Sequence, residues 1–394
     1  MDFWLKDEQK MLRYNIREFA EQEIAPVAME LDEKEEFSYD LTRKMAKLGL
    51  FGIYVPAEYG GSGMDYLSYI VAVEEICRID GSHGATVAAG NSLGIGPIYY
   101  YGSKKQKDQW LPRLCSGEIL ASFGLTEPNA GSDAGASKTN ARLENGQWVV
   151  NGSKIFITNS TSKMAGICTV QAITGSKGQK VGPYGTIETK EVSCILVPNG
   201  TPGFTTKKMT KKMMWRSSDT GELYFDDCRV PEENLLGKRG EGFHQMLQTL
   251  DNGRLAIAAM GLGGAQGAYE LAMKYAKERK QFGKPISTFQ VNAFKLADMA
   301  TEIEAARNLL YKACYLKDQG KSFGKEAAMA KLYCSEVMGR VTNEALQIHG
   351  GYGLMKEYNI ERFFRDYKLL TIGEGTSEVQ RIVISRRIGC YETD

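Results

Sequence analysis

The spacing of apolar residues changes twice along this chain of 394 residues, and that change limits the possible folds more than any other feature. In the first third, apolar residues recur at helical spacing with charges between them, as in Leu5, Met11, Leu12, Ile16 and Phe19. Near residue 121 the period shortens to two, which is typical of strands, and from Gly242 the helical period returns.

The pattern therefore predicts an α+β protein, and its length exceeds the about 250–300 residues at which one core stops growing. We expect an N-terminal helical domain over residues 1–120, a middle β-barrel or β-sandwich domain over 121–236, and a C-terminal helical bundle over 237–394.

Local signals refine this layout. Asn151-Gly152 favours a hairpin turn, with a return strand over 154–158, and the polar residues 174–191 predict a long surface loop between two strands. Ser287 to Gln290 matches a capping box and predicts the start of a helix. The apolar stripe of that helix is expected to contain Val291, Phe294, Met299, Ile303 and Leu310.

Charge and composition exclude several classes of protein. The chain has 49 Lys and Arg against 48 Asp and Glu, so no basic surface for nucleic acid is predicted. No apolar run approaches the ~20 residues that span a bilayer, and membrane insertion is not expected. The charged N-terminus resembles neither a signal nor a transit peptide, which predicts a cytoplasmic protein, with a processed organelle enzyme as the open alternative. Eight cysteines without a CxxC pair, and only three histidines, predict reduced, mostly buried thiols and no metal site.

Four segments carry the functional signal, and they occur in a fixed order. They are Gly124-Leu-Thr-Glu-Pro-Asn-Ala-Gly-Ser-Asp133, Glu278-Arg-Lys-Gln-Phe-Gly-Lys284, Gln347-Ile-His-Gly-Gly-Tyr-Gly-Leu354 and Gly373-Glu-Gly-Thr-Ser-Glu-Val-Gln-Arg381. In this order they resemble the signature segments of the FAD-dependent acyl-CoA dehydrogenase family, and the resemblance covers essentially the whole chain. The glycine-rich run from Gly261 to Gly267 does not have the spacing of a dinucleotide loop and favours close helix packing.

The resemblance implies that the chain desaturates an acyl-CoA thioester between Cα and Cβ, by removing an α-proton and passing the β-hydride to flavin N5. Glu374, between Gly373 and Gly375, occupies the position of the family's base. Taken alone, a glutamate near a helix start is more often a surface acid that interacts with the helix dipole. Some members place the base near residue 253, but this chain has Gly253 there, which cannot act as a base.

The resemblance also implies a set of cofactor contacts. One group is expected to bind the flavin and its pyrophosphate within the same subunit, and Phe156 replaces the tryptophan that is most common at its position. A second group resembles contacts made to the FAD of a neighbouring subunit, so a homo-oligomer, most simply a homotetramer, is predicted. The first group comprises Leu125, Thr126, Gly131, Ser132, Phe156 and Thr158, and the second comprises Arg279, Phe282, Gln347, Gly350 and Gly351. Thr376 and Glu378 match further cofactor contacts at the start of a helix.

The identity of the acyl chain is the least determined feature. Substrate contacts are expected from Ser132, Asn91, Arg254, Gly373 and Gly375, although Arg254 could also be a surface arginine. The small residues from Gly84 to Gly96 predict an open pocket. A branched, cyclic or aromatic substrate, such as benzylsuccinyl-CoA or cyclohexane-carboxyl-CoA, is therefore the favoured hypothesis.

Two sets of alternatives stay open. A short or medium linear acyl-CoA is one alternative substrate, and glutaryl-CoA is another, although Gly84 aligns with the arginine that binds its distal carboxylate. The resemblance implies an electron-transferring flavoprotein as acceptor, with oxygen as the other candidate. A DNA-binding or nitroalkane-oxidising flavoprotein is the alternative of another class, and the neutral charge and intact Glu374 weigh against it.

Overall fold

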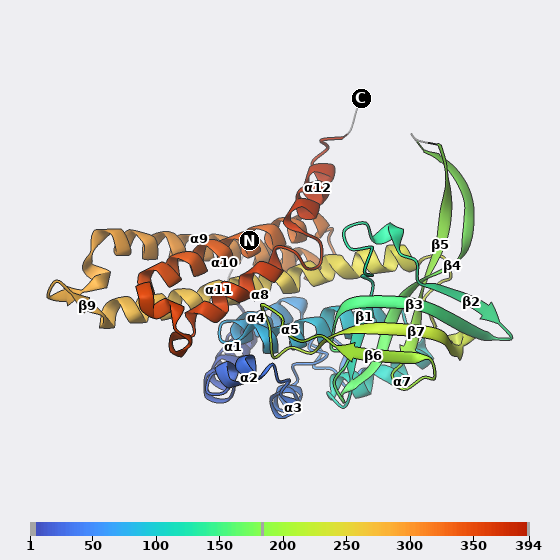
Figure 1. Cartoon of the computed structure of the whole chain (residues 1–394), viewed down its shortest axis with the longest axis horizontal. Coiled ribbons are helices and arrows are strands. Elements are labelled where there is room, and N and C mark those ends of the chain that lie inside the picture. Colours follow the sequence, from blue (N-terminus) through green and yellow to red (C-terminus); the bar gives the residue numbers. More distant parts are fainter. Residues whose placement is uncertain (1–4, 183–184, 392–394) are drawn as a thin grey trace.

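The computed structural model describes residues 5–182 and 185–391, and it has helices at both ends of the chain and a sheet between them (Figure 1). The predicted three-domain α+β fold is confirmed. The exact domain boundaries stay predictions. In the described part of the chain, no helix is both long enough and apolar enough to cross a membrane.

The N-terminal part is a cluster of helices around α4. Nearly every residue of α4 is buried, which explains why its sequence is apolar on all sides. A short π-helical segment, Gly90–Ile95, joins α5 to α6. The helices are α1 (Asp7–Phe19), α2 (Ala28–Lys34), α3 (Tyr39–Lys47), α4 (Tyr66–Cys77), α5 (Gly81–Ala89), α6 (Gly96–Tyr101) and α7 (Lys104–Cys115).

The middle part is an eight-stranded sheet with the order β6-β7-β3-β2-β4-β5-β8, and β1 pairs in parallel with β4. Alternate residues of its strands form a separate apolar core that includes Trp148, Val150 and Phe225. The strands are β1 (Leu120–Gly124), β2 (Asn140–Glu144), β3 (Gln147–Thr158), β4 (Ala165–Gly182), β5 (Gly185–Pro198), β6 (Phe204–Lys208), β7 (Thr220–Pro231) and β8 (Leu235–Leu236).

Two sequence predictions in this sheet are wrong. The hairpin turn lies at Asn145-Gly146, where both residues have positive φ, whereas Asn151 and Gly152 lie inside β3. Residues 174–182 and 185–191 are not a loop, because they belong to β4 and β5, which form an antiparallel ribbon that projects from the sheet (Figure 1). Residues 183 and 184 of the predicted loop lie outside the described residues. Polar composition misled the prediction, because a two-stranded ribbon with solvent on both faces needs no apolar face.

The C-terminal part is built on α8 (Gly242–Glu278), which packs against α4, α9 (Gln290–Asp318) and α10 (Gly324–His349). Two short strands, β9 (Lys280–Gln281) and β10 (Lys284–Pro285), join α8 to α9, and α11 (Ile360–Leu370) and α12 (Ser377–Arg387) complete the chain. Close packing of the glycine run is confirmed. A Cβ on Gly263 would lie 2.1 Å from the Glu74 carbonyl oxygen, and one on Gly267 would lie 2.0 Å from that of Arg78.

The start of α9 differs from the prediction. Ser287 lies in a 3₁₀ turn, and α9 begins at Gln290 with no side-chain cap. Met299, Ile303 and Leu310 are buried, but Val291 is 63% exposed and Phe294 is 59% exposed. The first part of the predicted stripe therefore has no partner within the described chain. The eight cysteines are free thiols, and all except Cys390 are buried.

Candidate active site

Glu374 lies in the loop between α11 and α12. Glu374 has φ 51° and Gly375 has φ 91°, so two successive residues are left-handed. A positive φ is uncommon for a residue other than glycine, and it persists only where the surroundings hold it. The loop is closed by a hydrogen bond of 2.9 Å from the Ser377 N–H to the Thr371 carbonyl oxygen.

The Glu374 side chain is half-buried, but its Oε2 atom is fully buried and has no hydrogen-bond partner in the described structure. This oxygen lies against Gly253 of α8, where an added Cβ would be only 1.8 Å away. The fold therefore brings together the two backbone positions that the resemblance offered for a base. Because Gly253 has no side chain, the Glu374 carboxyl group can occupy the space beside it.

The surroundings of Glu374 favour proton transfer near neutral pH. Burial raises the pKa of Glu374 to about 7, while the positive charges of Lys331 and Arg254 act in the opposite direction. A carboxyl group with such a pKa can accept a proton as a carboxylate and hold it afterwards. The backbone N–H of Glu374 has no acceptor among the described residues, so it is free to donate to a ligand.

Arg254 is not a surface residue. It is 6% exposed and forms an ion pair with Asp251, and its Nε atom is buried without a partner in the described structure. Burial lowers the pKa of the guanidinium, and the charges of Asp251 and Glu374 oppose this effect. The alternative of a surface arginine is therefore wrong.

A cavity of about 540 Å³ is lined by residues of α6, α8, the end of α9 and the loop that follows it, and α12. It reaches Asp251 and Asn252, the residues directly before Gly253. The ammonium of Lys317 donates to the Asn252 Oδ1 atom (2.7 Å), and it lies 4.4 Å from the ring centre of Tyr66 and 5.2 Å from that of Tyr100. Burial lowers the pKa of Lys317 to about 8. The cavity is lined by Tyr100, Tyr101, Gln248, Asp251, Asn252, Lys317, Gly320, Lys321, Ser322, Phe323, Gly324 and Arg387.

Asn91 does not face a cavity. It is completely buried, its Oδ1 accepts from the Gly52 N–H (2.7 Å), and its amide donates to the carbonyl oxygens of Leu50 (2.7 Å) and Val87 (2.9 Å). The bonds with Gly52 and Leu50 join the π-helical segment to the loop after α3, and the bond with Val87 joins it to α5. This geometry argues against the predicted contact between Asn91 and substrate. Gly373, in contrast, has only Leu369 within 4 Å of an added Cβ.

The end of β3 presents an aromatic ring to solvent. Phe156 has φ 62° and is 62% exposed, and the β3–β7 register shifts at this point. Ile157 is buried, so Phe156 and the half-buried Thr158 lie on the more open side of the strand. An exposed phenylalanine at a β-bulge is costly unless a ligand covers it.

A buried ion pair ties the loop after β1 to β3. The Lys154 ammonium donates to the Glu127 Oε1 atom (2.8 Å) and to the Leu125 carbonyl oxygen (3.3 Å). The Glu127 carboxylate also accepts from the N–H groups of Lys138 (2.7 Å) and Thr139 (3.0 Å). Leu125 is buried, Thr126 is half-buried, and Gly131 and Ser132 are exposed. Sequence reasoning did not identify Glu127 and Lys154, although a lysine at a buried strand position was a signal.

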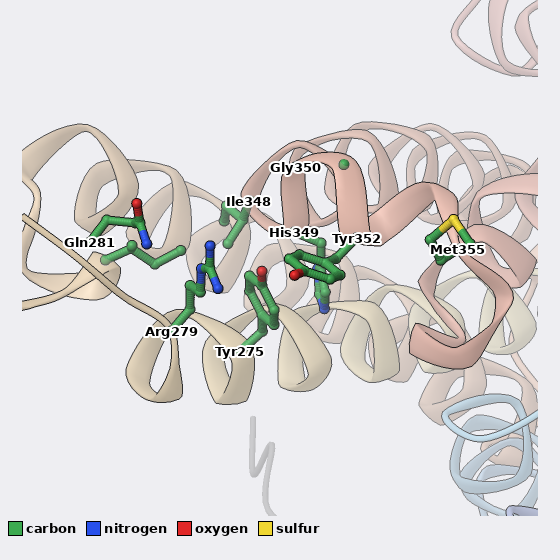
Figure 2. Close-up of a pocket in the computed structure, with 10 residues that line it drawn as sticks. Tyr275, Arg279, Gln281, Ile348, His349, Gly350, Tyr352 and Met355 are labelled. Carbon is green, nitrogen blue, oxygen red and sulfur yellow. The ribbon is translucent and has the colours of Figure 1, made fainter.

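The other predicted cofactor residues lie elsewhere. Arg279, Gly350 and Gly351 line a cavity of about 510 Å³, in which the Arg279 guanidinium lies 5.4 Å from the ring centre of Tyr352 (Figure 2). Gln347 is exposed, and Phe282, in the turn between β9 and β10, is 93% exposed. This region lies at the opposite end of the longest axis from β2 and β3 (Figure 1). Thr376 caps α12 by accepting from the Val379 N–H (3.2 Å), and Glu378 is exposed.

In the described part of the chain, no group of three or more His, Cys, Asp or Glu side chains is placed to hold a metal ion. The exposed ring of Phe156 and the open glycine Gly131, which has nothing within 4 Å of an added Cβ, fit a large planar cofactor with a polar tail.

The sequence matches models of a known protein family over most of its length. The family models described as "Acyl-CoA dehydrogenase, N-terminal domain", "middle domain" and "C-terminal domain" match residues 6–118, 122–228 and 240–389. The chain is 50% identical to "Probable acyl-CoA dehydrogenase YngJ" of Bacillus subtilis, over 98% of this chain and 100% of that protein. It is 46% identical to "Acyl-CoA dehydrogenase, short-chain specific" of Clostridium acetobutylicum, over 98% and 100%.

Solved structures share the fold over the whole chain. Butyryl-CoA dehydrogenase from Megasphaera elsdenii has a TM-score of 0.93 at 44% identity, with 98% of this chain and 100% of that chain covered. A chain from a structure described as an electron transferring flavoprotein of Acidaminococcus fermentans has a TM-score of 0.93 at 47% identity, with 98% and 99% covered. A glutaryl-CoA dehydrogenase from Mycobacterium smegmatis, solved in complex with FADH2, has a TM-score of 0.90 at 29% identity, with 99% and 96% covered.

A three-domain fold with a buried glutamate on the loop before the last helix defines a class of flavin-dependent oxidoreductases that act on CH–CH groups. The chain belongs to the acyl-CoA dehydrogenase family, whose cofactor is FAD.

Proposed function

We propose that the protein desaturates short linear acyl-CoA thioesters and that Glu374 is the base. The buried, unpartnered Oε2 atom of Glu374, held by a left-handed backbone, is the observation that carries this proposal. Glu374 would take the α-proton, and when bound, FAD supplies the acceptor for the hydride that leaves Cβ. The free N–H of Glu374 would donate to the thioester oxygen, on which negative charge grows as the proton leaves.

The flavin ring is proposed to lie against Phe156 and Thr158. The loop that Glu127 and Lys154 tie to β3 would hold its pyrimidine edge through Leu125 and Thr126 and its pyrophosphate through Gly131 and Ser132. Exposed backbone in a glycine-containing loop suits a phosphate group. The hydroxyl of Ser132 is also available to the CoA part of the substrate.

A second copy of the chain is proposed to complete this cofactor site. The hairpin of β9 and β10, which Arg279 precedes and whose turn contains Phe282, lies at the opposite end of the long axis from β3, which contains Phe156 (Figure 1). Phe282 of the β9–β10 turn and Val291 and Phe294 at the start of α9 are exposed apolar side chains, which supports contact with another subunit. We propose a homo-oligomer and keep the homotetramer as its predicted form.

The bulky-substrate hypothesis loses its structural premise. A Cβ on Gly84 would lie 2.0 Å from the Cys77 Sγ atom, one on Gly90 would lie 2.8 Å from the Phe51 ring, and one on Gly94 would lie 2.8 Å from the Ala121 carbonyl oxygen. These glycines let helices and strands pack closely, and they do not leave volume for substrate. The resemblance to short-chain and butyryl-CoA dehydrogenases supports a short linear acyl chain.

The CoA part of the substrate is proposed to enter through the cavity that contains Lys317. Two residues that line this cavity, Asp251 and Asn252, directly precede Gly253 in α8, and Gly253 contacts the Glu374 carboxyl group. Its cations, Lys317, Lys321 and Arg387, suit the phosphates of CoA. The similarity to a chain from a structure described as an electron transferring flavoprotein supports such a protein as electron acceptor. A cytoplasmic location stays a prediction.

Anaerobic bleaching of the yellow protein by a panel of thioesters tests the substrate. We expect butyryl-CoA to bleach the flavin fastest, followed by octanoyl-CoA, with little effect from glutaryl-CoA or cyclohexane-carboxyl-CoA. Fastest bleaching by the cyclic thioester would restore the bulky-substrate hypothesis. A protein that no acyl-CoA bleaches, but that a nitroalkane reduces, would contradict the proposal as a whole.

A further inference from the structure

A lysine with no exposed surface lies beneath the base loop. Lys331 of α10 is completely buried, and its ammonium donates to the carbonyl oxygen of Gly375 (2.6 Å). A buried ammonium usually pairs with a carboxylate, because transferring it from water to the interior is costly. Here it donates instead to the backbone of the residue next to the base.

Other side chains hold the same loop. Gln380 donates from its amide to the carbonyl oxygens of Gly375 (2.9 Å) and Glu374 (3.3 Å). One helical turn after Lys331, the Ser335 hydroxyl lies 3.0 Å from the carbonyl oxygen of Leu370, where α11 ends, and 2.7 Å from that of Lys331, so the two oxygens share its one proton. Helix α10 therefore holds the loop at both of its ends, and Lys331 holds the end that contains the two left-handed residues.

Charges from several helices face Glu374. The ammonium of Lys331 comes from α10 and the guanidinium of Arg254 from α8, and both favour the carboxylate form of Glu374. The phenol of Tyr69 on α4 also lies within electrostatic range, and Glu378 on α12 acts on Lys331. Burial lowers the pKa of Lys331 to about 8, and the charge of Glu374 opposes this shift. At neutral pH Lys331 therefore carries its charge.

We propose that Lys331 is a positioning residue, which holds Glu374 and Gly375 in their left-handed conformation and stabilises the carboxylate of the base in the free enzyme. This inference rests on the proposed role of Glu374. Lys331 itself need not touch the substrate, because its ammonium is occupied by the Gly375 carbonyl oxygen.

Lys331→Met tests the proposal, because methionine keeps most of the volume and removes both the hydrogen bond and the charge. With butyryl-CoA, kcat should fall about 10–100-fold, since a displacement of about 1 Å in a reacting group can cost 10²-fold, while KM changes little. The acid limb of kcat/KM should move to higher pH by about one unit, because loss of a nearby positive charge raises the pKa of Glu374.

Two further variants separate the charge from the hydrogen bond. Lys331→Arg keeps the charge, so the acid limb should stay at the wild-type position even if kcat falls. Lys331→Gln keeps a donor without the charge, so the limb should shift as in the Met variant. The matched control is Lys325→Met on the same helix, a partly exposed lysine that pairs with Glu326 and should leave kcat and the limb unchanged.

Flavin absorbance and circular dichroism establish that each variant folds and binds FAD. If Lys331→Met does not fold, the Arg and Gln pair carries the test through the position of the limb. The inference would be overturned if Lys331→Met left both kcat and the acid limb of kcat/KM unchanged. It would also be overturned if that acid limb stayed at the same pH in every variant. If Glu374→Gln were active, the proposed function would fail first, whereas an inactive Glu374→Gln beside a normal Lys331→Met refutes this inference alone.

Discussion

At the scale of single residues, Glu374 has two energetically unfavourable features that ordinary surface acids lack. Its backbone is left-handed, and one carboxyl oxygen is buried without a partner in the described structure. Both features are typical of functional sites, where a group is held ready for a ligand that supplies the missing interactions. The raised pKa of Glu374 has the same origin, because burial of the carboxyl group by the surrounding protein disfavours its charged form.

Glu374→Gln tests the base directly. The amide cannot accept the α-proton, so turnover of butyryl-CoA should fall by about 10²–10⁴-fold while FAD stays bound. In the wild type, kcat/KM should decrease as pH falls through about 7, since only the carboxylate form accepts the proton. Steady-state rates across pH and the flavin absorbance provide the measurement, and a glutamine variant with near-normal turnover would show that another residue is the base.

Gly253→Ala tests the contact between α8 and the base. The new methyl group would lie 1.8 Å from the Glu374 Oε2 atom, so the carboxyl group has to move. We expect kcat to fall about 10²-fold with little change in FAD content, because a displacement of about 1 Å is costly in a reacting group. In a Glu374→Gln background the same substitution should cost little more, and an equal further loss there would point to damage elsewhere on α8.

Lys317→Met tests the proposed entrance for CoA. A charged hydrogen bond is worth about 1.5–3 kcal/mol, so KM for butyryl-CoA should rise about 10–100-fold. Butyryl-pantetheine lacks the nucleotide phosphates, and its KM should change little. Measuring both substrates with both proteins separates the effects, and equal changes for the two thioesters would argue that Lys317 acts on the acyl pocket instead.

Some residues of the candidate site could be predicted from the sequence, and others could not. Glu374 was predictable because its segment is continuous and resembles a known signature. Glu127, Lys154 and Lys331 were not, because each is defined by partners distant in the chain, and only the fold shows that their charges are buried. Asn91 was misassigned for the same reason, since its amide bonds only to backbone groups of the core.

At the scale of elements, the ribbon formed by β4 and β5 is the main surprise. Both strands extend beyond the sheet, and residues 175–179 are exposed. The ribbon is fixed at its base, where Arg239 pairs with Glu191 (2.7 Å) and the Lys190 ammonium donates to the Ser137 carbonyl oxygen (2.9 Å). Its outer part carries none of the predicted site residues.

Replacing residues 177–189 with Asn-Gly would shorten the ribbon to the paired residues Ser176 and Lys190. Because the contacts at its base remain, we expect Tm to change by less than about 4 °C and kcat/KM for butyryl-CoA to stay within about twofold. Thermal unfolding and a dye-coupled assay, with the wild type as reference, give both values. Loss of FAD in the shortened protein would mean that the outer ribbon helps to build the site.

The sequence predicted which segments are helices and which are strands, but it did not predict the turn between β2 and β3 or the start of α9. Periodicity separated the helical parts from the strands, because one buried face is enough to produce the pattern. Periodicity could not show whether Asn145-Gly146 or Asn151-Gly152 forms the turn, because this depends on the register with the partner strand. The start of α9 was also missed, because exposed Val291 and Phe294 resemble a core stripe in sequence alone.

At the scale of the whole molecule, the two proposed groups of cofactor residues lie at opposite ends of the long axis (Figure 1). The group around Phe156 belongs to the sheet, and the group around Arg279 belongs to the far end of the helical bundle. The resemblance to a known family predicted a shared site, whereas the separation of the two groups could be seen only in three dimensions.

Phe282→Asp tests the shared site without damage to the fold. Phe282 is 93% exposed, so its loss should not destabilise the single chain. Burying a phenylalanine contributes about 1.5–3 kcal/mol, so FAD affinity should fall by about 10–100-fold in the variant. The ratio of flavin to protein absorbance after gel filtration measures this, with Met11→Asp, an exposed apolar side chain of α1, as a control that should keep its FAD. Full FAD content in Phe282→Asp would contradict the shared site.

The separation of Arg279 from Phe156 has a consequence for how cofactor retention depends on protein concentration. If two chains complete the site, FAD binding depends on the concentration of the protein as well as on that of FAD. Diluting the holoenzyme therefore lowers subunit association and cofactor occupancy together. FAD should then dissociate more readily from dilute solutions than a fixed dissociation constant allows, and added FAD should in turn shift monomers toward the assembled form.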